Sequence, residues 1–407
     1  MLKIILVILS STILGAFITF LTQMLLAMHL APQEYGVFSA SISLVMIVTP
    51  LIAMGADGYL LKYHAENEGE IKLFNSFYLR YFALTIAPVF LIYLVIGSDI
   101  GNAFFLLVIS QALLNLSTAQ CQVRSKYYQM SLMLLMQSLL RIVLLSGVIF
   151  WNDLFIDSVY YIYISVSVII IFTVLIQIYY LNAKKVFYTG SIQRSDISDL
   201  TKLSYPFGIG VLCHLVYFQS DILILSKFLP SEQVAYYSLA FTVISVSYLL
   251  PSVIYQKYLQ PKIHKMHHNN SKDERKVFIQ GGKIMFYFGL TGSIAFYLLA
   301  EFVIVTFFGE EYSASIQFIE VLAICIFFRY LSCNAGVFLV SGNLISKKNT
   351  YMIITALLNV TLNFILIPKL GALGAAYSTI FSEIVLCVLF YYGVNKYKFK
   401  FLGKLSV

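Results

Sequence analysis

Charged residues are scarce in this chain. They make up 11% of its 407 residues, while 60% of the residues are apolar. A soluble globular protein is about a quarter charged and nearer half apolar, so this deficit excludes an ordinary soluble domain and indicates a chain surrounded by lipid. The net charge of +8 does not indicate nucleic-acid binding, because the basic residues lie in short segments between apolar runs.

Motifs for catalysis and metal binding are also missing. The sequence has no P-loop, no HExxH motif and no GxSxG nucleophile turn, so we predict that the chain is not an enzyme and uses no cofactor. The five cysteines show no CxxC spacing and are expected to be small packing residues: Cys121, Cys213, Cys325, Cys333 and Cys387. A basic segment contains His264, His267 and His268 but no further ligands, so a solvated loop is expected there rather than a metal site.

Long apolar runs fill most of the chain. A helix of roughly 20 apolar residues crosses the hydrocarbon core of a bilayer. The first run is too long for a signal peptide and lacks a small-residue cleavage site, so it is expected to remain as a helix. The sequence predicts an all-α membrane protein of about twelve transmembrane helices, near 4–28, 36–56, 77–97, 103–120, 132–150, 159–181, 204–228, 234–256, 284–306, 316–340, 350–368 and 371–394.

Lysine and arginine alternate with the predicted spans. With the N-terminus in the cytoplasm, 22 of the 27 basic residues fall in cytoplasmic segments, and only Lys227 and Lys369 lie at the edges of external loops. This positive-inside pattern predicts a multi-pass protein of the inner (plasma) membrane with both termini cytoplasmic. All predicted external loops are short, which disfavours a membrane polymerase or ligase that needs an external catalytic domain.

The chain divides into two similar halves. We expect an N-terminal six-helix lobe over 1–181, a cytoplasmic linker over 182–203, a C-terminal six-helix lobe over 204–394 and a basic tail over 395–407. A shift of 199 residues places Gly36 on Ala235 and Ser39 on Ser238. Two halves with the same number of spans and the same orientation indicate a parallel duplication, a design that transporters often use to hold substrate between the halves.

Three stretches carry a family resemblance: LAPQEYGVFSASISLVMIVTPLIAMGADGYLLKY over 30–63, FQSDILILSKFLPSEQVAYY over 218–237, and LNVTLNFILIPKLGALGAAYSTIFSE over 358–383. Together they resemble the polysaccharide-exporter branch of the multidrug/oligosaccharidyl-lipid/polysaccharide (MOP) superfamily, in the style of Wzx-type O-antigen flippases. The resemblance implies a MATE/MOP-like fold with two six-helix lobes around a central cavity. It implies undecaprenyl-diphosphate oligosaccharide, such as an O-antigen repeat unit for lipopolysaccharide, as cargo. The partners to consider are membrane lipids, a coupling ion (H+ or Na+) and the polysaccharide polymerase and chain-length machinery.

Arginines within the predicted spans are candidate substrate ligands, because an ionisable group in a span is costly and usually faces a cavity or a partner. Arg141 lies mid-span, with Gln137 one turn earlier on the same face, and Arg329 lies mid-span in the tenth helix. A planar guanidinium suits phosphate oxygens, so we predict that both bind the diphosphate. The alternative is that each pairs with an acidic or carbonyl partner and has a structural role. Arg80, near the cytoplasmic end of the third span, either binds substrate or extends to the interface.

Polar stripes along two helices are candidate sugar-binding faces. Gln111, Asn115 and Thr118 follow one face of the fourth span, and Asn359 lies on a similar stripe in the eleventh. Such stripes suit a water-filled cavity that meets sugar hydroxyls. The alternative is hydrogen bonding between helices that holds the bundle together.

Asp221 in the seventh span is a candidate ion-coupling residue, with His214 seven residues earlier on the same face. An acid in a span can carry a proton or bind sodium, and it can equally form a structural salt bridge or hydrogen bond. A cavity for cationic drugs would favour acids over arginines. The intramembrane arginines therefore favour the flippase over a drug or cation exporter of the same superfamily, which remains the alternative.

Overall fold

A computed structural model describes residues 2–60, 82, 85–91, 93–95, 104–151, 154–183, 194–252, 254–255, 259, 263, 266, 273–340 and 344–399, with side chains omitted for 2–9, 178, 181–183 and 194–200. These residues form helices and their connections, without a strand among them. The predicted all-α class is therefore confirmed. The predictions for Arg80 and for the His264, His267 and His268 cluster fall outside the described residues.

Within the described residues, ten helices are long and apolar enough to cross a membrane. They are α1 (Leu2–His29), α2 (Pro32–Ala53), α5 (Phe105–Val123), α6 (Tyr127–Trp151), α7 (Ile156–Ala183), α8 (Arg194–Phe228), α12 (Asp273–Phe308), α13 (Ser315–Phe338), α14 (Ile345–Leu370) and α15 (Ala372–Gly393). Helix α9 (Ser231–Ser247) and a short apolar helix over Thr85–Val95 account for the two remaining predicted spans. The short elements are α10 (Leu249–Ser252), η3 (Glu310–Tyr312) and η4 (Val394–Phe399).

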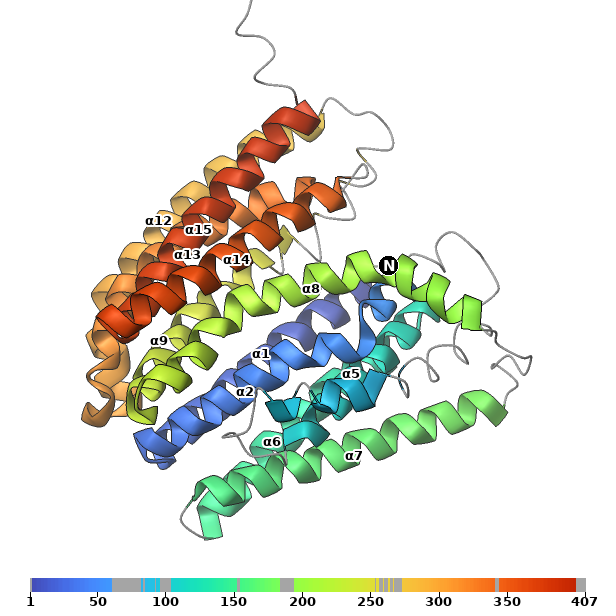
Figure 1. Ribbon diagram of the computed structural model, residues 1–407, viewed down its shortest axis with the longest axis horizontal. Helices are drawn as coiled ribbons and strands as arrows, with labels where there is room; N and C mark the ends of the chain where they lie inside the picture. The colour runs from blue at the N-terminus through green and yellow to red at the C-terminus, as the bar shows by residue number, and fades with distance from the viewer. Residues whose placement is uncertain are drawn as a thin grey trace, which may run out of the picture. The chain divides into compact units, whose positions relative to one another are not determined.

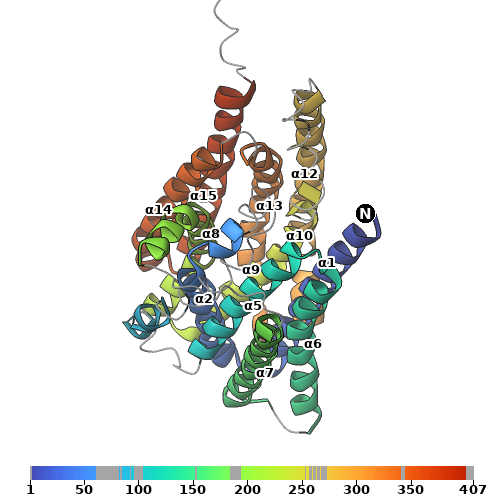
Figure 2. The same cartoon turned by 90° about the vertical axis from the view of Figure 1, so that its right-hand side faces the viewer.

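The helices gather into two compact units. The N-terminal unit comprises Met1–Leu30 and Val37–Leu215, and the C-terminal unit comprises Ala31–Gly36 and Val216–Val407. In the N-terminal unit, α1 packs on α6, and α5 packs on α6 and α7 (Figure 1). In the C-terminal unit, α13 packs between α12 and α15, and α14 packs on α15 (Figure 2). The units divide inside α8, whereas the sequence places the boundary in the connection over 182–203.

Large apolar side chains cover the outside of several helices. Trp151 is 80% exposed and Tyr161 is 71% exposed. In the most apolar 18-residue segment of α12, only 17% is buried within the protein. Water would penalise such faces, whereas lipid covers them without cost. The chain is therefore a multi-pass membrane protein.

A left-handed turn ends α2 and positions the residues that follow it. Met54 and Gly55 have φ angles of 42° and 77°. A Cβ atom on Gly55 would lie 2.0 Å from the amide nitrogen of Gly208 in α8, so only glycine allows this close approach. The turn redirects the chain into a helical segment over 56–60 and thereby directs Asp57 toward α5.

Candidate substrate cavity and cation site

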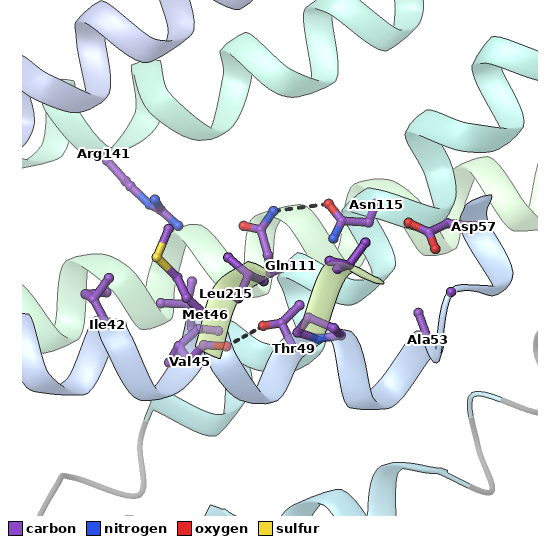
Figure 3. A pocket seen from close by; sticks show the side chains of 14 residues that line it. Ile42, Val45, Met46, Thr49, Ala53, Asp57, Gln111, Asn115, Arg141 and Leu215 are labelled. Carbon is purple, nitrogen blue, oxygen red and sulfur yellow. Dashed lines mark hydrogen bonds between the residues drawn. The ribbon is translucent and has the colours of Figure 1, made fainter. Parts of the chain in front are cut away.

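A cavity of about 270 Å³ lies inside the N-terminal unit. Its walls come from α2, α5, α6 and α8, and from the segment after the Gly55 turn. Apolar side chains form most of the wall, including Ile42, Val45, Met46 and Leu215 (Figure 3). The polar side chains of the lining are Gln111, Asn115, Arg141, Asp57 and Thr49, and the Thr49 hydroxyl donates to the Val45 carbonyl oxygen of its own helix. A mostly apolar cavity with a few convergent polar groups is the usual form of a ligand site.

Arg141 supplies the positive charge of the cavity. Its guanidinium carbon lies 4.7 Å from the ring centroid of the buried Tyr163, which holds the side chain by a cation–π contact. Its Nε atom is buried and has no hydrogen-bond partner among the described residues. A buried donor without a partner is costly, so the arrangement suits an anion that accepts this hydrogen bond.

A chain of amides joins α6 to α5 beside Arg141. Gln137 Nε2 donates to Gln111 Oε1 at 2.8 Å, and Gln111 Nε2 donates to Asn115 Oδ1 at 3.3 Å. Together the two bonds fix the orientation of both α5 amides, and Figure 3 shows the bond between Gln111 and Asn115. Four predicted substrate residues, Arg141, Gln111, Asn115 and Gln137, thus lie together. The fifth from these helices, Thr118, donates its hydroxyl to the Asn115 carbonyl oxygen at 2.9 Å and is not part of the cavity wall.

Asp57 is a cavity residue that the sequence analysis missed. Figure 3 shows Asp57 and Arg141 at opposite ends of the cavity, with Gln111 and Asn115 between them. Asp57 follows the predicted end of a span. A carboxylate is common at such a position and does not by itself indicate a binding site. The Gly55 turn, which needs a tertiary contact with α8, brings it into the wall. The small-residue sequence Met-Gly-Ala-Asp-Gly over 54–58 was the available hint.

Asp221 is the centre of a polar cluster in the C-terminal unit. Its side chain is buried, at 2% exposure, on α8. Tyr237 donates its hydroxyl to Oδ2 at 2.8 Å, Asn363 Nδ2 donates to Oδ1 at 2.5 Å, and the Thr379 hydroxyl also donates to Oδ2. The cluster therefore joins α8, α9, α14 and α15 around one carboxylate.

Asn359 belongs to this cluster rather than to the N-terminal cavity. Its Oδ1 accepts hydrogen bonds from Ser220 at 2.9 Å and from Asn363 at 3.1 Å. Its own Nδ2 and the Oδ1 of Asn363 are buried without a hydrogen-bond partner among the described residues. Carboxylate, amide and hydroxyl oxygens are the ligands that hard cations prefer. The cluster thus offers the ligand atoms of a cation site, and two of its amide atoms are not engaged by the described residues.

His214 lies two turns before Asp221 on α8 and is partly exposed. The hydrogen bonds to Asp221 come instead from Tyr237, Asn363 and Thr379. The structure therefore connects Asp221 with groups on three other helices. The sequence showed only that His214 and Asp221 share one face of their own helix.

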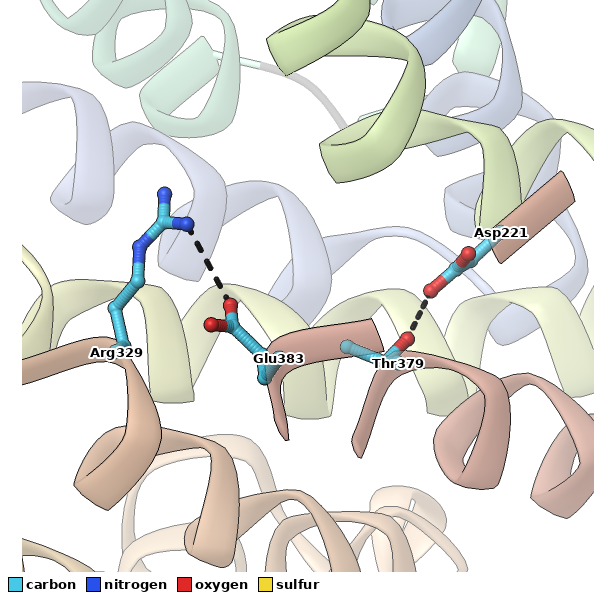
Figure 4. A network of polar contacts seen from close by, with 4 residues as sticks. All are labelled: Asp221, Arg329, Thr379 and Glu383. Carbon is cyan, nitrogen blue, oxygen red and sulfur yellow. Dashed lines mark hydrogen bonds and ion pairs between the residues drawn. The ribbon is translucent and has the colours of Figure 1, made fainter. Parts of the chain in front are cut away.

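Arg329 forms a buried ion pair. Its Nη1 lies 3.5 Å from Glu383 Oε1, and the two side chains are 13% and 2% exposed. The guanidinium also lies over the rings of Phe218 and Tyr248, at 5.5 Å and 5.3 Å. Glu383 lies one turn after Thr379 on α15. This helix therefore carries the acid of the ion pair and one of the hydroxyls that bond to Asp221 (Figure 4). Pairing with an acid is the structural alternative that the sequence left open for Arg329.

The comparisons with known proteins agree with this architecture. A family model described as "Polysaccharide biosynthesis protein" matches residues 1–267. The chain belongs to this polysaccharide biosynthesis family. The predicted relationship to the polysaccharide-exporter branch of the MOP superfamily is confirmed. No curated protein sequence matches the chain.

Solved structures show the fold of this family member. One is an inward-facing multidrug resistance MATE family transporter of the MOP superfamily, with a TM-score of 0.75 and 12% identity over 97% of this chain and 96% of that one. Another is the lipid II flippase MurJ in an inward closed conformation, with a TM-score of 0.71 and 15% identity over 98% and 90% of the two chains. A Vibrio cholerae MATE transporter gives a TM-score of 0.59 at 12% identity, over 98% of both chains. The chain therefore has the fold of these transporters.

Proposed function

We propose that this protein flips a lipid-linked oligosaccharide across the membrane. The cargo is an undecaprenyl-diphosphate oligosaccharide, such as an O-antigen or related repeat unit, and it moves from the cytoplasmic to the periplasmic face of the inner membrane. The observation that carries the proposal is Arg141, a cation with an unpaired buried Nε beside the aligned amides of Gln111 and Asn115. Family membership and the MOP-type fold support it.

The chemistry of the cavity matches the headgroup of such a lipid. The diphosphate needs a cationic donor that stays charged inside the membrane, and Arg141 supplies it. The sugar next to the phosphate needs donors and acceptors, which the two α5 amides and Asp57 provide. Transport by alternating access then exposes the loaded cavity outside while the lipid tail remains in the bilayer.

The Asp221 cluster is the proposed coupling site for H+ or Na+. An acid buried in a membrane span usually serves a function, and here the hydroxyls of Tyr237 and Thr379 and the amide nitrogen of Asn363, from three further helices, converge on it. Binding of a cation replaces the hydrogen bonds from Asn363 and Thr379 with oxygen–cation contacts. Such an exchange couples occupancy of the site to the packing of α8 against α14 and α15.

A drug or cation exporter is the second candidate function. The specific observation that favours it is Asp57, a carboxylate in the same cavity that would attract a cationic drug. The two functions differ in which charged side chain binds the substrate. Arg141 would bind a diphosphate, and Asp57 would bind a cationic drug. A membrane polysaccharide polymerase is less favoured, since the fold is that of transporters.

The deciding experiment follows lipid-linked sugars in a strain that lacks the protein. The flippase proposal expects undecaprenyl-diphosphate oligosaccharide to accumulate on the cytoplasmic face, with delivery restored by the wild-type gene and not by the Arg141→Gln variant. Normal delivery of single units outside would overturn the proposal. Drug sensitivity restored by wild type and lost in Asp57→Asn, with normal sugar delivery, would establish the exporter instead.

A further inference from the structure

A second cavity, of about 670 Å³, lies on the C-terminal unit and takes no part in the proposed transport path. Phe286 and Tyr287 of α12, Val388 of α15 and Leu331 of α13 contribute to its apolar lining. Val388 is 61% exposed and Tyr287 is 66% exposed, so the groove opens outward. Its volume falls within the range of about 300–1,000 Å³ that is typical of small-molecule sites.

The two walls of this groove are held in place by one amide. Asn334 of α13 donates from Nδ2 to the Phe278 carbonyl oxygen of α12 and to the Tyr391 hydroxyl of α15, both at 3.3 Å. An ion pair between Lys398 and Glu274, with Nζ 2.5 Å from Oε1, ties η4 to the first turn of α12. Helices α12 and α15, which form the two walls, are therefore both hydrogen bonded to α13. The groove is thus already formed without a ligand.

Lys283 is the charged residue of the groove lining, and among the residues that the structure describes no carboxylate lines the groove with it. Lys276 lies seven residues earlier on α12, on the same face, and both lysines are exposed. The stretch after Lys283 is free of charge as far as Glu301. Lys283 thus marks the membrane surface, on the side that the positive-inside pattern assigns to the cytoplasm, and the apolar part of the groove extends from it into the hydrocarbon.

We propose that this groove binds an anionic glycerophospholipid of the cytoplasmic leaflet. One acyl chain lies against Phe286, Leu331 and Val388, and the phosphate lies against Lys283. Basic pockets between transmembrane helices on the cytoplasmic side recognise anionic headgroups in this way. The preference for a net negative lipid follows from the charge of the lining. A zwitterionic lipid carries its own cation next to the phosphate and gains less from Lys283.

The test compares phosphatidylglycerol with phosphatidylcholine of the same acyl chains, by native mass spectrometry of the purified full-length protein. Wild type should retain phosphatidylglycerol preferentially. Lys283→Gln should lower phosphatidylglycerol retention about fivefold, the factor for one lysine at an anionic membrane surface, with little change for phosphatidylcholine. Val388→Trp, at an exposed position that tolerates bulk, should fill the groove and lower the retention of both lipids.

The matched control is Lys369→Gln, which removes an exposed lysine from the last turn of α14, outside the groove. It should leave retention unchanged. Thermal unfolding of each variant confirms that it is folded. The proposal is overturned if Val388→Trp binds phosphatidylglycerol like wild type, because attraction is then only to surface charge. It is also overturned if phosphatidylglycerol fails to displace added undecaprenyl phosphate, because the groove then belongs to a polyprenyl tail.

Discussion

Gln33 and Glu232 are 199 residues apart and hydrogen bonded, with Gln33 Nε2 donating to Glu232 Oε2 at 3.3 Å. The same shift of 199 residues aligns Gly36 with Ala235 in the sequence, and a Cβ atom on Gly36 would lie 1.8 Å from the Ser231 carbonyl oxygen and 3.2 Å from the Ala235 nitrogen. The start of α2 therefore packs against the start of its counterpart, α9.

A crosslink at this contact should leave transport intact. Gln33 and Glu232 both belong to the C-terminal unit, so alternating access by movement of the two units requires no change in the distance between them. We expect the Gln33→Cys/Glu232→Cys protein to form a disulfide or to react with a short bifunctional thiol reagent. Lipid-linked sugar delivery should not change with the crosslinked fraction. Each single cysteine variant is the control, and a loss of delivery that returns on reduction would show that this contact opens during the cycle.

Arg141→Gln should lower delivery of the lipid-linked sugar by about 10–100-fold, the range for losing a charge-assisted hydrogen bond of roughly 1.5–3 kcal/mol. Arg141→Lys keeps the charge but loses the planar fork, so an intermediate rate is expected. Accumulation of sugar on the cytoplasmic face is the measurement, at matched protein levels. The flippase proposal would be weakened severely by a Gln variant that delivers sugar at the wild-type rate.

Asp221→Asn should abolish the dependence of transport on an ion gradient, because the cluster loses its only carboxylate among the described ligands. Thr379→Val keeps the shape but removes one oxygen, so we expect the half-saturating cation concentration to rise about tenfold, as for one lost hydrogen bond or ligand to a charged group. Thr361→Val is the control, since Thr361 is exposed and, among the described residues, its hydroxyl donates to the Leu357 carbonyl oxygen of its own helix. The measurement is transport in vesicles at several Na+ concentrations and pH values. Unchanged ion dependence in Asp221→Asn would exclude this cluster as the coupling site.

Arg329→Met should destabilise the protein by about 3–5 kcal/mol, because it leaves the buried Glu383 carboxylate without its cation. The Arg329→Met/Glu383→Met protein should be more stable than either single variant, since it removes both charges together. Thermal unfolding of purified protein measures this. Additive losses in the double variant would contradict a structural pair. A stable double variant that fails to transport would instead indicate that Arg329 contacts the diphosphate.

Gly55→Ala should reduce the folded fraction strongly, with a cost of about 1–3 kcal/mol for a residue forced into a left-handed backbone conformation, before the clash with Gly208 is added. Gly147→Ala on α6 is the matched control, because its added Cβ would meet nothing within 4 Å. Helix propensity predicts a neutral or slightly stabilising effect there. The measurement is the yield of monodisperse protein and its melting temperature. Equal behaviour of the two variants would show that the close approach at Gly55 is not required.

The sequence was sufficient to predict the fold class and the number of spans. Each transmembrane helix satisfies its own backbone hydrogen bonds, and a local apolar run in the sequence identifies it. It also placed Gln111 and Asn115 on one helical face, since that relation depends only on the helical period. Arg141 and Asp221 were also predictable as candidate site residues, because a charged residue within an apolar run can be recognised without tertiary information.

Only the tertiary structure decided which of these residues meet. It paired Arg329 with Glu383, assigned Asn359 to the Asp221 cluster, and brought Asp57 into the cavity beyond Gln111 and Asn115. Each of these contacts joins different helices, so it depends on how side chains of distant segments pack. A close backbone approach such as Gly55 against Gly208 controls that packing, and no local pattern in the sequence encodes it.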